Sequence, residues 1–219
     1  MSKKSKTPWP TKAVMHQIYS EHLWGGKEYD FYSGDGSHHT EIVQSYLDAV
    51  ISFFNTQNNA LTVCDLGCGD FNIGKHFTEY TKHYIAIDIV EELIERNNTK
   101  FKAENIEFQC LDISKDELPS ADCIILRQVL QHLSNEEILN IVNKLTNYTY
   151  VILTEHLPLG NFEPNKDKIT SQGIRLKLNS GVVISEMPFD LKFKAEKTLV
   201  EIVLDNNKGR IKTILYRLK

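Results

Sequence analysis

The spacing of apolar residues along the chain changes near residue 60. Before this point, apolar residues recur every three or four positions over residues 38–54, which predicts a helix of about four turns. A shorter helix is expected over residues 13–23, ended by Gly25 and Gly26. After residue 60, short apolar runs alternate with helical stretches, and this alternation is typical of an α/β fold.

Several short runs after residue 60 are apolar for most of their length and are predicted to be strands, at residues 61–66, 84–89, 106–111, 122–126 and 148–154. Strands of this kind belong to a parallel sheet that is covered on both faces. The stretches between them that are expected to be helical are residues 73–80, 91–98 and 134–145. Ser134 and Glu137 form a capping box at the start of the last of these helices.

The end of the chain follows a different pattern. Residues 210–218 alternate between apolar and polar positions, and a polar turn separates them from the apolar run at residues 199–204. This predicts an antiparallel hairpin that joins the sheet at its end. Residues 158–197 show no clear period and are too long for an ordinary connection, so we expect a functional surface there. The expected organisation is an N-terminal helical segment at residues 1–60 and a sheet domain at residues 61–219.

The charge balance disfavours partners that bind through a strong positive field. The chain has 25 Lys and Arg residues against 29 Asp and Glu residues, a net charge of −4, which argues against nucleic-acid binding through a general basic surface. No apolar run approaches the roughly 20 residues needed to span a bilayer. Residues 1–10 are basic and polar, without the apolar core of a secretory signal. We expect a cytoplasmic protein with no membrane partner.

The cysteines favour the same compartment. None belongs to a Cys-x-x-Cys pair and most lie in apolar runs, so they are expected to be reduced and buried. No metal site is expected, because the ligand spacing of a zinc site is missing and the His38–His39 pair lacks further ligands. The cysteines are Cys64, Cys68, Cys110 and Cys123.

A glycine-rich turn follows the first predicted strand, in the sequence Asp-Leu-Gly-Cys-Gly-Asp at residues 65–70. Glycines at such a turn let backbone N–H groups approach a ligand. The dinucleotide-binding pattern needs a third glycine three residues after Gly69, where this chain has Asn72. Asp65 would also repel a pyrophosphate, so the turn favours a cationic ligand over a dinucleotide.

The second and third predicted strands end in carboxylates as well. Asp88 at the tip of the second strand is placed to accept both hydrogens of a ribose diol. Asp112 at the tip of the third is placed to accept from an exocyclic amine, with Ile113 packing on a purine face. Taken singly, each aspartate is more often a helix cap or a solvated loop charge than a ligand-binding residue. Together they mark one edge of the sheet, which is where ligands of open α/β sheets bind.

These motifs, Asp-Leu-Gly-Cys-Gly-Asp, Ile-Asp-Ile and Leu-Asp-Ile, resemble those of the class I S-adenosylmethionine-dependent methyltransferases over residues 61–154. The resemblance implies a Rossmann-like, doubly wound, seven-stranded sheet, mostly parallel, with the last strand inserted antiparallel. It implies S-adenosylmethionine as the cofactor, with Gly67 and Gly69 at the methionine moiety, Asp88 on the ribose and Asp112 with Ile113 at the adenine. Phe71 stands where the family often has a further glycine.

The segment before the sheet is expected to cover the cofactor. Residues 33–37 form a Ser/Gly-rich turn that offers N–H and hydroxyl groups to the cofactor carboxylate, although Ser37 is also a candidate N-cap for the following helix. The candidate cofactor-binding residues are Trp24, Ser33, Ser37, Asp65, Gly67, Gly69, Asp88, Ile89, Asp112, Ile113 and Arg127.

The acceptor is expected to approach the segment after the fourth strand. In the resembled family this segment faces the transferred methyl group, and the Asn/Asp-Pro-Pro-Tyr/Phe motif of DNA-adenine and glutamine methylation is replaced here by Leu-Arg-Gln-Val at residues 126–129. The His132–Leu133 pair is similar to that of small-molecule methyltransferases. His132 is a candidate general base, with a structural histidine as the alternative. Arg127 is expected to pair with the cofactor carboxylate, an anionic acceptor or a strand-tip aspartate.

Two further candidates, Glu155 and His156, follow the fifth predicted strand and are expected to bind or deprotonate the acceptor unless they are solvated loop charges. The expected function is S-adenosylmethionine-dependent transfer of a methyl group to a small-molecule acceptor by in-line displacement. An RNA or protein acceptor and a non-catalytic, cofactor-binding partner subunit remain alternatives.

Overall fold

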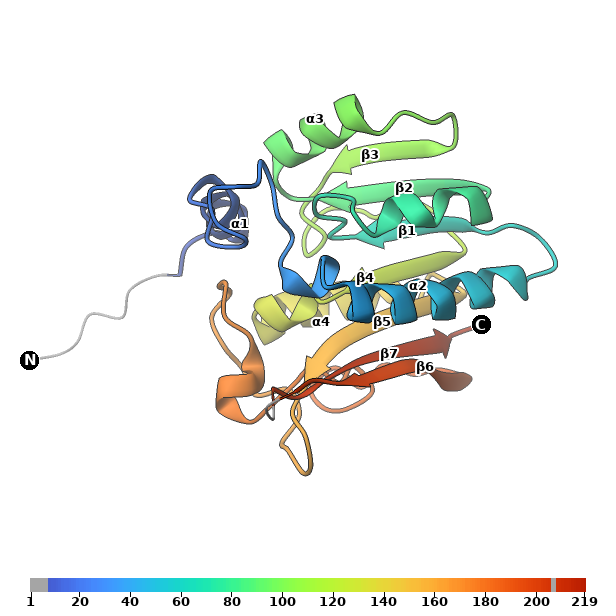
Figure 1. Cartoon of the computed structure of the whole chain (residues 1–219). Helices are drawn as coiled ribbons and strands as arrows, with labels where there is room; N and C mark the ends of the chain where they lie inside the picture. The colour runs from blue at the N-terminus through green and yellow to red at the C-terminus, as the bar shows by residue number, and fades with distance from the viewer. Residues whose placement is uncertain (1–7, 206–207) are drawn as a thin grey trace, which may run out of the picture.

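A computed structural model describes residues 8–205 and 208–219 (Figure 1). The basic positions at residues 3, 4 and 6, and part of the turn before residue 210, lie outside the described residues. The helices are α1 (Thr11–Ser20), α2 (Thr40–Asn55), α3 (Glu91–Lys100) and α4 (Asn135–Leu145). The strands are β1 (Thr62–Leu66), β2 (His83–Asp88), β3 (Ile106–Cys110), β4 (Cys123–Arg127), β5 (Tyr150–Leu157), β6 (Ala195–Val203) and β7 (Arg210–Arg217).

These strands form one seven-stranded sheet in the order β3-β2-β1-β4-β5-β7-β6. The pairs from β3 to β5 are parallel, and β7 is antiparallel to both β5 and β6. The α/β fold class predicted from the sequence, with its antiparallel C-terminal hairpin, is confirmed. The strand order reverses between β1 and β4, and open α/β sheets bind their ligands at such a reversal, beyond the carboxyl ends of the strands.

Helices cover both faces of the sheet, as the apolar strands require. The alternation of side chains along β4 shows this directly, because Ile124 lies in the apolar cluster beneath α4 while Ile125 lies in the cluster beneath α2. Ser134 caps α4 and forms the predicted capping box with Glu137. Within the described residues, no helix is long and apolar enough to cross a membrane.

The helix expected over residues 73–80 is replaced by two short 3₁₀ turns, Gly74–His76 and Thr78–Tyr80. The reason lies in the hydrogen bonds of this segment. The carbonyl of Thr78 accepts from Asn105 Nδ2 at 2.8 Å and from the hydroxyl of Thr81 at 3.1 Å. The backbone bonds run three residues back, from the Phe77 N–H to the Gly74 carbonyl at 2.9 Å and from the Tyr80 N–H to the Phe77 carbonyl at 3.0 Å, and Gly74 adds a residue of low helix propensity.

The boundary expected near residue 60 does not separate two packing units. Tyr46, Val50 and Phe54 of α2 lie in the same apolar cluster as Val63 of β1, so α2 is a layer of the sheet domain. Of the described residues before β1, those that precede α2 extend past the carboxyl ends of the strands, where Figure 1 shows α1. One cysteine also differs from expectation, because Cys110 at the end of β3 is exposed while the other three are buried.

Candidate active site

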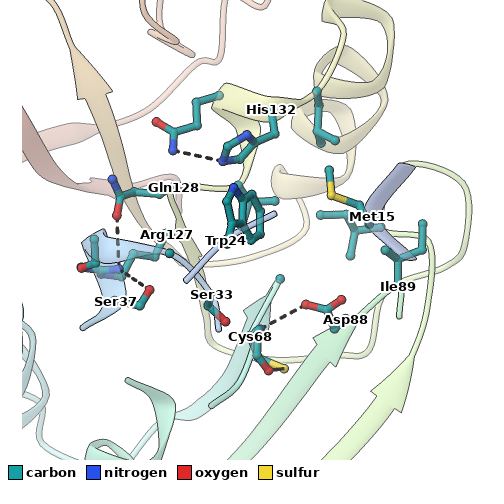
Figure 2. Close-up of a pocket in the computed structure, with 18 of the residues that line it drawn as sticks. Met15, Trp24, Ser33, Ser37, Cys68, Asp88, Ile89, Arg127, Gln128 and His132 are labelled. Atoms are coloured by element: carbon teal, nitrogen blue, oxygen red, sulfur yellow. Dashed lines mark hydrogen bonds between the residues drawn. The ribbon is translucent and has the colours of Figure 1, made fainter. Parts of the chain in front are cut away.

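A cavity of about 520 Å³ lies at the carboxyl ends of the central parallel strands. Its walls come from the ends of β1, β2 and β4, from α1 and residues 24–37, and from residues 172–177 (Figure 2). Its volume falls within the range of about 300–1,000 Å³ that is usual for small-molecule sites. Three segments that are far apart in the sequence therefore enclose one site at the strand-order reversal.

The glycine-rich turn after β1 can be built only with glycine at its two key positions. Gly67 and Gly69 have φ of +84° and +55°, in the left-handed region. A Cβ at Gly67 would lie 2.5 Å from the Val129 side chain, and one at Gly69 would lie 2.1 Å from Ser33 Oγ. The turn therefore fits closely against two neighbouring segments, and both glycines line the cavity.

Asp88 ends β2 at the cavity and is buried. Its Oδ2 accepts from the Gly69 N–H and its Oδ1 accepts from the Val90 N–H, both at 3.1 Å. Burial raises the pKa of this carboxyl, and the N–H donors oppose that rise. Each oxygen keeps one further lone pair, so the carboxylate can hold the turn and still accept two more hydrogens.

Asp65 and Asp112 also border the cavity but are held differently. Asp65 accepts from the Tyr84 hydroxyl at 2.8 Å, and burial raises its pKa to about 7. Asp112 accepts from the Ser114 N–H at 3.0 Å and from the Lys115 ammonium at 2.7 Å. Burial alone would raise the pKa of Asp112, but the Ser114 and Lys115 donors hold it below its usual range. Ile89 and Ile113 contribute apolar surface beside them.

Arg127 at the end of β4 holds the Ser/Gly-rich turn. Its guanidinium donates to Ser37 Oγ at 3.0 Å and to the Gly36 carbonyl, and it lies 4.7 Å from the Tyr46 ring centroid. Arg127 therefore bonds to the turn at residues 33–37. One expectation had paired it with a strand-tip aspartate, and its hydrogen bonds go to this turn instead. Ser37 does not cap α2, because that helix starts after His39 with no side-chain cap.

The same turn is bonded to the glycine-rich turn through Ser33 and Asp70. Ser33 Oγ accepts from the Asp70 N–H at 2.6 Å, and the Ser33 N–H donates to Asp70 Oδ2 at 3.2 Å. His38 Nε2 lies 2.6 Å from the same carboxylate oxygen and helps to keep the pKa of Asp70 low against the effect of burial. The sequence placed Asp70 in the glycine-rich motif and gave no role to His38, and their pairing could not be predicted because they lie more than thirty residues apart.

Trp24 and His132 form one end of the cavity. Their ring centroids are 5.2 Å apart, and Trp24 also packs edge-on against Tyr19 at 5.6 Å (Figure 2). His132 lies on a 3₁₀ turn, η4 (Leu130–His132), with its Nε2 3.3 Å from Gln131 Nε2. Its Nδ1 is buried and has no partner among the residues described. Burial and the Lys168 ammonium lower the pKa of His132 to about 4, so its imidazole is neutral at physiological pH.

The expected placement of Glu155 and His156 is wrong. Pairing of β5 with β7 continues to Leu157, so both residues lie inside the sheet instead of in a loop after it. Glu155 is buried and borders a separate cavity of about 180 Å³, and His156 Nε2 lies 2.6 Å from the Lys208 carbonyl oxygen. Neither lines the large cavity. Its remaining wall comes instead from the aperiodic segment, at Gln172, Gly173, Ile174 and Lys177.

Residues 63–149 match a protein-family model described as a methyltransferase domain. This part of the chain is a methyltransferase domain. A search of curated proteins finds no match by sequence. The class I motifs lie within or next to the matched residues, and S-adenosylmethionine-dependent methyl transfer is the activity that this match supports.

Solved structures of methyltransferases share the fold. The N-methyltransferase NodS from Bradyrhizobium japonicum, in complex with S-adenosyl-L-homocysteine, has a TM-score of 0.66 at 11% identity, covering 94% of this chain and 100% of that chain. Magnesium protoporphyrin IX methyltransferase from Synechocystis, with bound S-adenosylmethionine, has a TM-score of 0.62 at 14% identity, covering 98% and 100%. Human N-acetylserotonin methyltransferase has a TM-score of 0.58 at 18% identity, and the match covers 95% of this chain and 60% of that chain. At these identities the likeness concerns the fold.

Proposed function

We propose that this protein is a methyltransferase that transfers the methyl group of S-adenosylmethionine to a small-molecule acceptor. The observation that carries the proposal is the single cavity, which is bounded at once by the strand-end carboxylates and by the Trp24–His132 wall. Sites of about 300–1,000 Å³ hold one drug-sized ligand. A cavity of about 520 Å³ that takes such a cofactor has room for only a small acceptor.

The residues around the strand ends fit this cofactor. Asp88 has a spare lone pair on each oxygen, which suits the two hydroxyl groups of a ribose. Asp112 keeps acceptor capacity on Oδ2 for an exocyclic amine, and Ile113 beside it offers apolar surface to an adenine ring. Gly67 and Gly69 line the cavity, and without side chains their backbone can lie close to the methionine moiety.

The pre-sheet segment is proposed to close over the methionine end. Ser37 Oγ accepts from Arg127, so its own hydroxyl hydrogen is free to donate to a carboxylate. Ser33 stands at the opposite end of the same turn, and Trp24 covers the space between the turn and His132. Asp65 lines the site at the end of β1, where its carboxyl group accepts from Tyr84 and burial raises its pKa to about 7.

S-adenosylmethionine supplies an electrophilic methyl group on a sulfonium with a thioether leaving group. The protein has to place the acceptor in line, exclude water and receive a proton. His132 is proposed to receive it. A pKa of about 4 makes its imidazole a weak base. The hydroxyl group of an acceptor becomes strongly acidic as its oxygen bonds to the methyl carbon, so a weak base is sufficient late in a transfer to oxygen.

The proposal is tested by incubating the protein with S-adenosylmethionine and a metabolite extract, and following the mixture by mass spectrometry. We expect a small molecule that becomes heavier by one CH₂ only when active protein is present. Methylation confined to RNA or protein fractions would replace the small-molecule acceptor by a macromolecular one. Tight binding of S-adenosylhomocysteine without any methylated product would indicate a non-catalytic partner subunit.

We also propose that the protein works in the cytoplasm. Cys64, Cys68 and Cys123 are buried as free thiols, and Cys110 is a free thiol at the surface. Such usage suits a reducing compartment. Thiol titration of protein purified without reductant and then denatured is expected to find all four cysteines reduced. A disulfide in that material would argue for an oxidising location.

A further inference from the structure

Arg175 is one of the most deeply buried side chains of the described chain, with 1% of its surface exposed. It belongs to the aperiodic segment and lies beneath the η4 turn. Its guanidinium and Nε donate hydrogen bonds to four carbonyl oxygens and one side-chain amide oxygen. These are Lys166 at 2.9 Å, Leu130 at 3.2 Å, Gln131 at 3.2 Å, Leu133 at 2.8 Å and Asn135 Oδ1 at 2.9 Å.

Residues 168–175 bind the whole of the turn that carries His132. The one carbonyl of residues 130–133 that Arg175 does not reach is that of His132, and it accepts from Lys168 Nζ at 2.9 Å and from the Ser171 N–H at 3.0 Å. The same segment continues into the cavity wall at Gln172. Gln172 Nε2 in turn donates to the Leu23 carbonyl at 2.7 Å, next to Trp24.

The opposite side of the turn faces Glu155 of β5. The N–H groups of Leu130 and Gln131 point toward its carboxyl group, although both carboxyl oxygens lack a hydrogen-bond partner in the described part of the chain. Burial raises the pKa of Glu155 to about 8, against the opposing effects of the Arg175 guanidinium and these N–H groups. The turn is thus bonded by a guanidinium on its carbonyl side and faces a buried carboxyl group on its N–H side.

A buried arginine is costly, because its guanidinium stays charged and must be desolvated. If this position only had to fill space in the core, an apolar residue of similar size would be sufficient. The planar fork is suited to bonding several oxygens in a fixed arrangement, which a lysine ammonium cannot reproduce. Here the oxygens are those of one short backbone turn, so what Arg175 fixes is the direction in which the Gln131 and His132 side chains leave that turn.

We infer that Arg175 is a positioning residue of the methyl-transfer site: it fixes η4 so that Gln131 and His132 face the acceptor end, and it couples that turn to the Gln172 wall. This inference rests on the proposed function of the cavity. Arg175 does not line the cavity itself, so its effect on the reaction passes through the residues that it holds. The sequence analysis expected Glu155 to contact the acceptor. We assign it instead to the surroundings of η4, where it faces the N–H side of the turn.

The test replaces Arg175 by lysine, which keeps the positive charge but loses the fork. The matched control is Arg210→Lys, because Arg210 pairs with Glu201 between β7 and β6, away from the large cavity. The readout is an NMR pH titration of the His132 imidazole, assigned by comparison with His132→Gln. The charged groups around the turn are Lys168 and Arg175 from its own side, Glu155 from β5 and Glu137 from α4.

In the native protein and in Arg210→Lys we expect His132 to titrate near pH 4. In Arg175→Lys the turn loosens and admits water, so the pKa of His132 is expected to rise toward its ordinary value of about 6.5. Affinity for S-adenosylhomocysteine, measured by calorimetry, is expected to stay within about twofold, because the strand-end contacts are remote from the change. With an acceptor from the metabolite screen, kcat should fall while the KM for S-adenosylmethionine is kept.

A residue that only stabilises the fold would lower the melting temperature and leave the His132 titration of the folded protein unchanged, and that result would overturn the inference. If Arg175→Lys does not fold, Asn135→Ala removes one of the five partners and should shift the His132 titration less, in the same direction. An unchanged titration in that variant would also overturn it. Failure of the native protein to bind S-adenosylhomocysteine would instead count against the proposed function.

Discussion

Asp88 gives the sharpest test of how the cavity binds its cofactor. In Asp88→Ala the carboxylate that faces the cavity is removed, together with the acceptors of the Gly69 and Val90 N–H groups. A matched control is Asp122→Ala. Asp122 also accepts a backbone N–H, from Thr62 at 2.8 Å, but it lies at the other end of β1 and outside the cavity.

The expected loss of affinity follows from the hydrogen bonds that Asp88 can make. Each spare lone pair accepts one ribose hydroxyl in a charge-assisted bond worth about 1.5–3 kcal/mol. Losing both bonds should cost at least about 3 kcal/mol, or roughly a hundredfold in Kd. Because the variant also leaves two buried N–H groups without acceptors, its thermal unfolding has to be measured first. Asp88→Asn, which keeps one acceptor oxygen, should be the more stable of the two variants.

Isothermal titration calorimetry with S-adenosylhomocysteine measures the effect. We expect native-like affinity for Asp122→Ala, a roughly hundredfold weaker Kd for Asp88→Ala and at least a tenfold weaker Kd for Asp88→Asn, with no binding of NAD by the native protein. Affinity should also decrease as the pH falls, starting at a higher pH than for an ordinary aspartate, because burial raises the pKa of Asp88 and the protonated form accepts fewer hydrogens. A folded Asp88→Ala protein that binds as tightly as the native one would refute the ribose assignment.

Three further predictions concern the lid, the acceptor end and the buried carboxyl of β1. Deleting residues 1–37 should leave a folded sheet, seen by circular dichroism, with poor affinity for S-adenosylhomocysteine; native affinity in a folded truncation would rule out the lid. His132→Ala should lower kcat by roughly 10²–10⁴-fold with nearly unchanged cofactor affinity, and the native rate should fall only as the pH approaches about 4; an unaltered rate would remove His132 from the reaction. Because the folded-state pKa of Asp65 is raised to about 7, the folded protein holds a proton that the unfolded chain has lost, so native stability should decrease as the pH rises from about 4 to about 7. Asp65→Asn should flatten that decrease in urea unfolding, and an equally steep decrease would show that another group is responsible.

Local sequence signals determined the parts of this protein that could be predicted. The buried strands, the glycine-rich turn and the capping box at Ser134 depend on neighbouring residues, and the structure has all of them near the expected positions. The ends of β5 could not be predicted in this way, because its pairing with β7 carries the strand through Glu155 and His156. That long-range pairing is why two proposed acceptor-contacting residues lie away from the cavity.

The aperiodic segment was the least predictable part. The roles of its residues depend on hydrogen bonds to distant parts of the chain. Arg175 bonds to the carbonyls of η4, and Gln172 bonds to the Leu23 carbonyl. Neither has a periodic or motif-like signature, and only the length of the segment indicated that it had a role. The pairing of Asp70 with His38 and Ser33 is similar, since a carboxylate in a turn shows no partner in the sequence itself.

The central claim, that one cavity holds both the cofactor and a small acceptor, is tested most directly by following a labelled methyl group. Trideuteromethyl S-adenosylmethionine is incubated with the native protein and a desalted cell extract, to which the metabolite fraction is added back, and small molecules, RNA and protein are then analysed separately by mass spectrometry. The account predicts label in the small-molecule fraction, lost with Asp88→Ala and kept with Asp122→Ala. Label that enters only RNA or protein would contradict it.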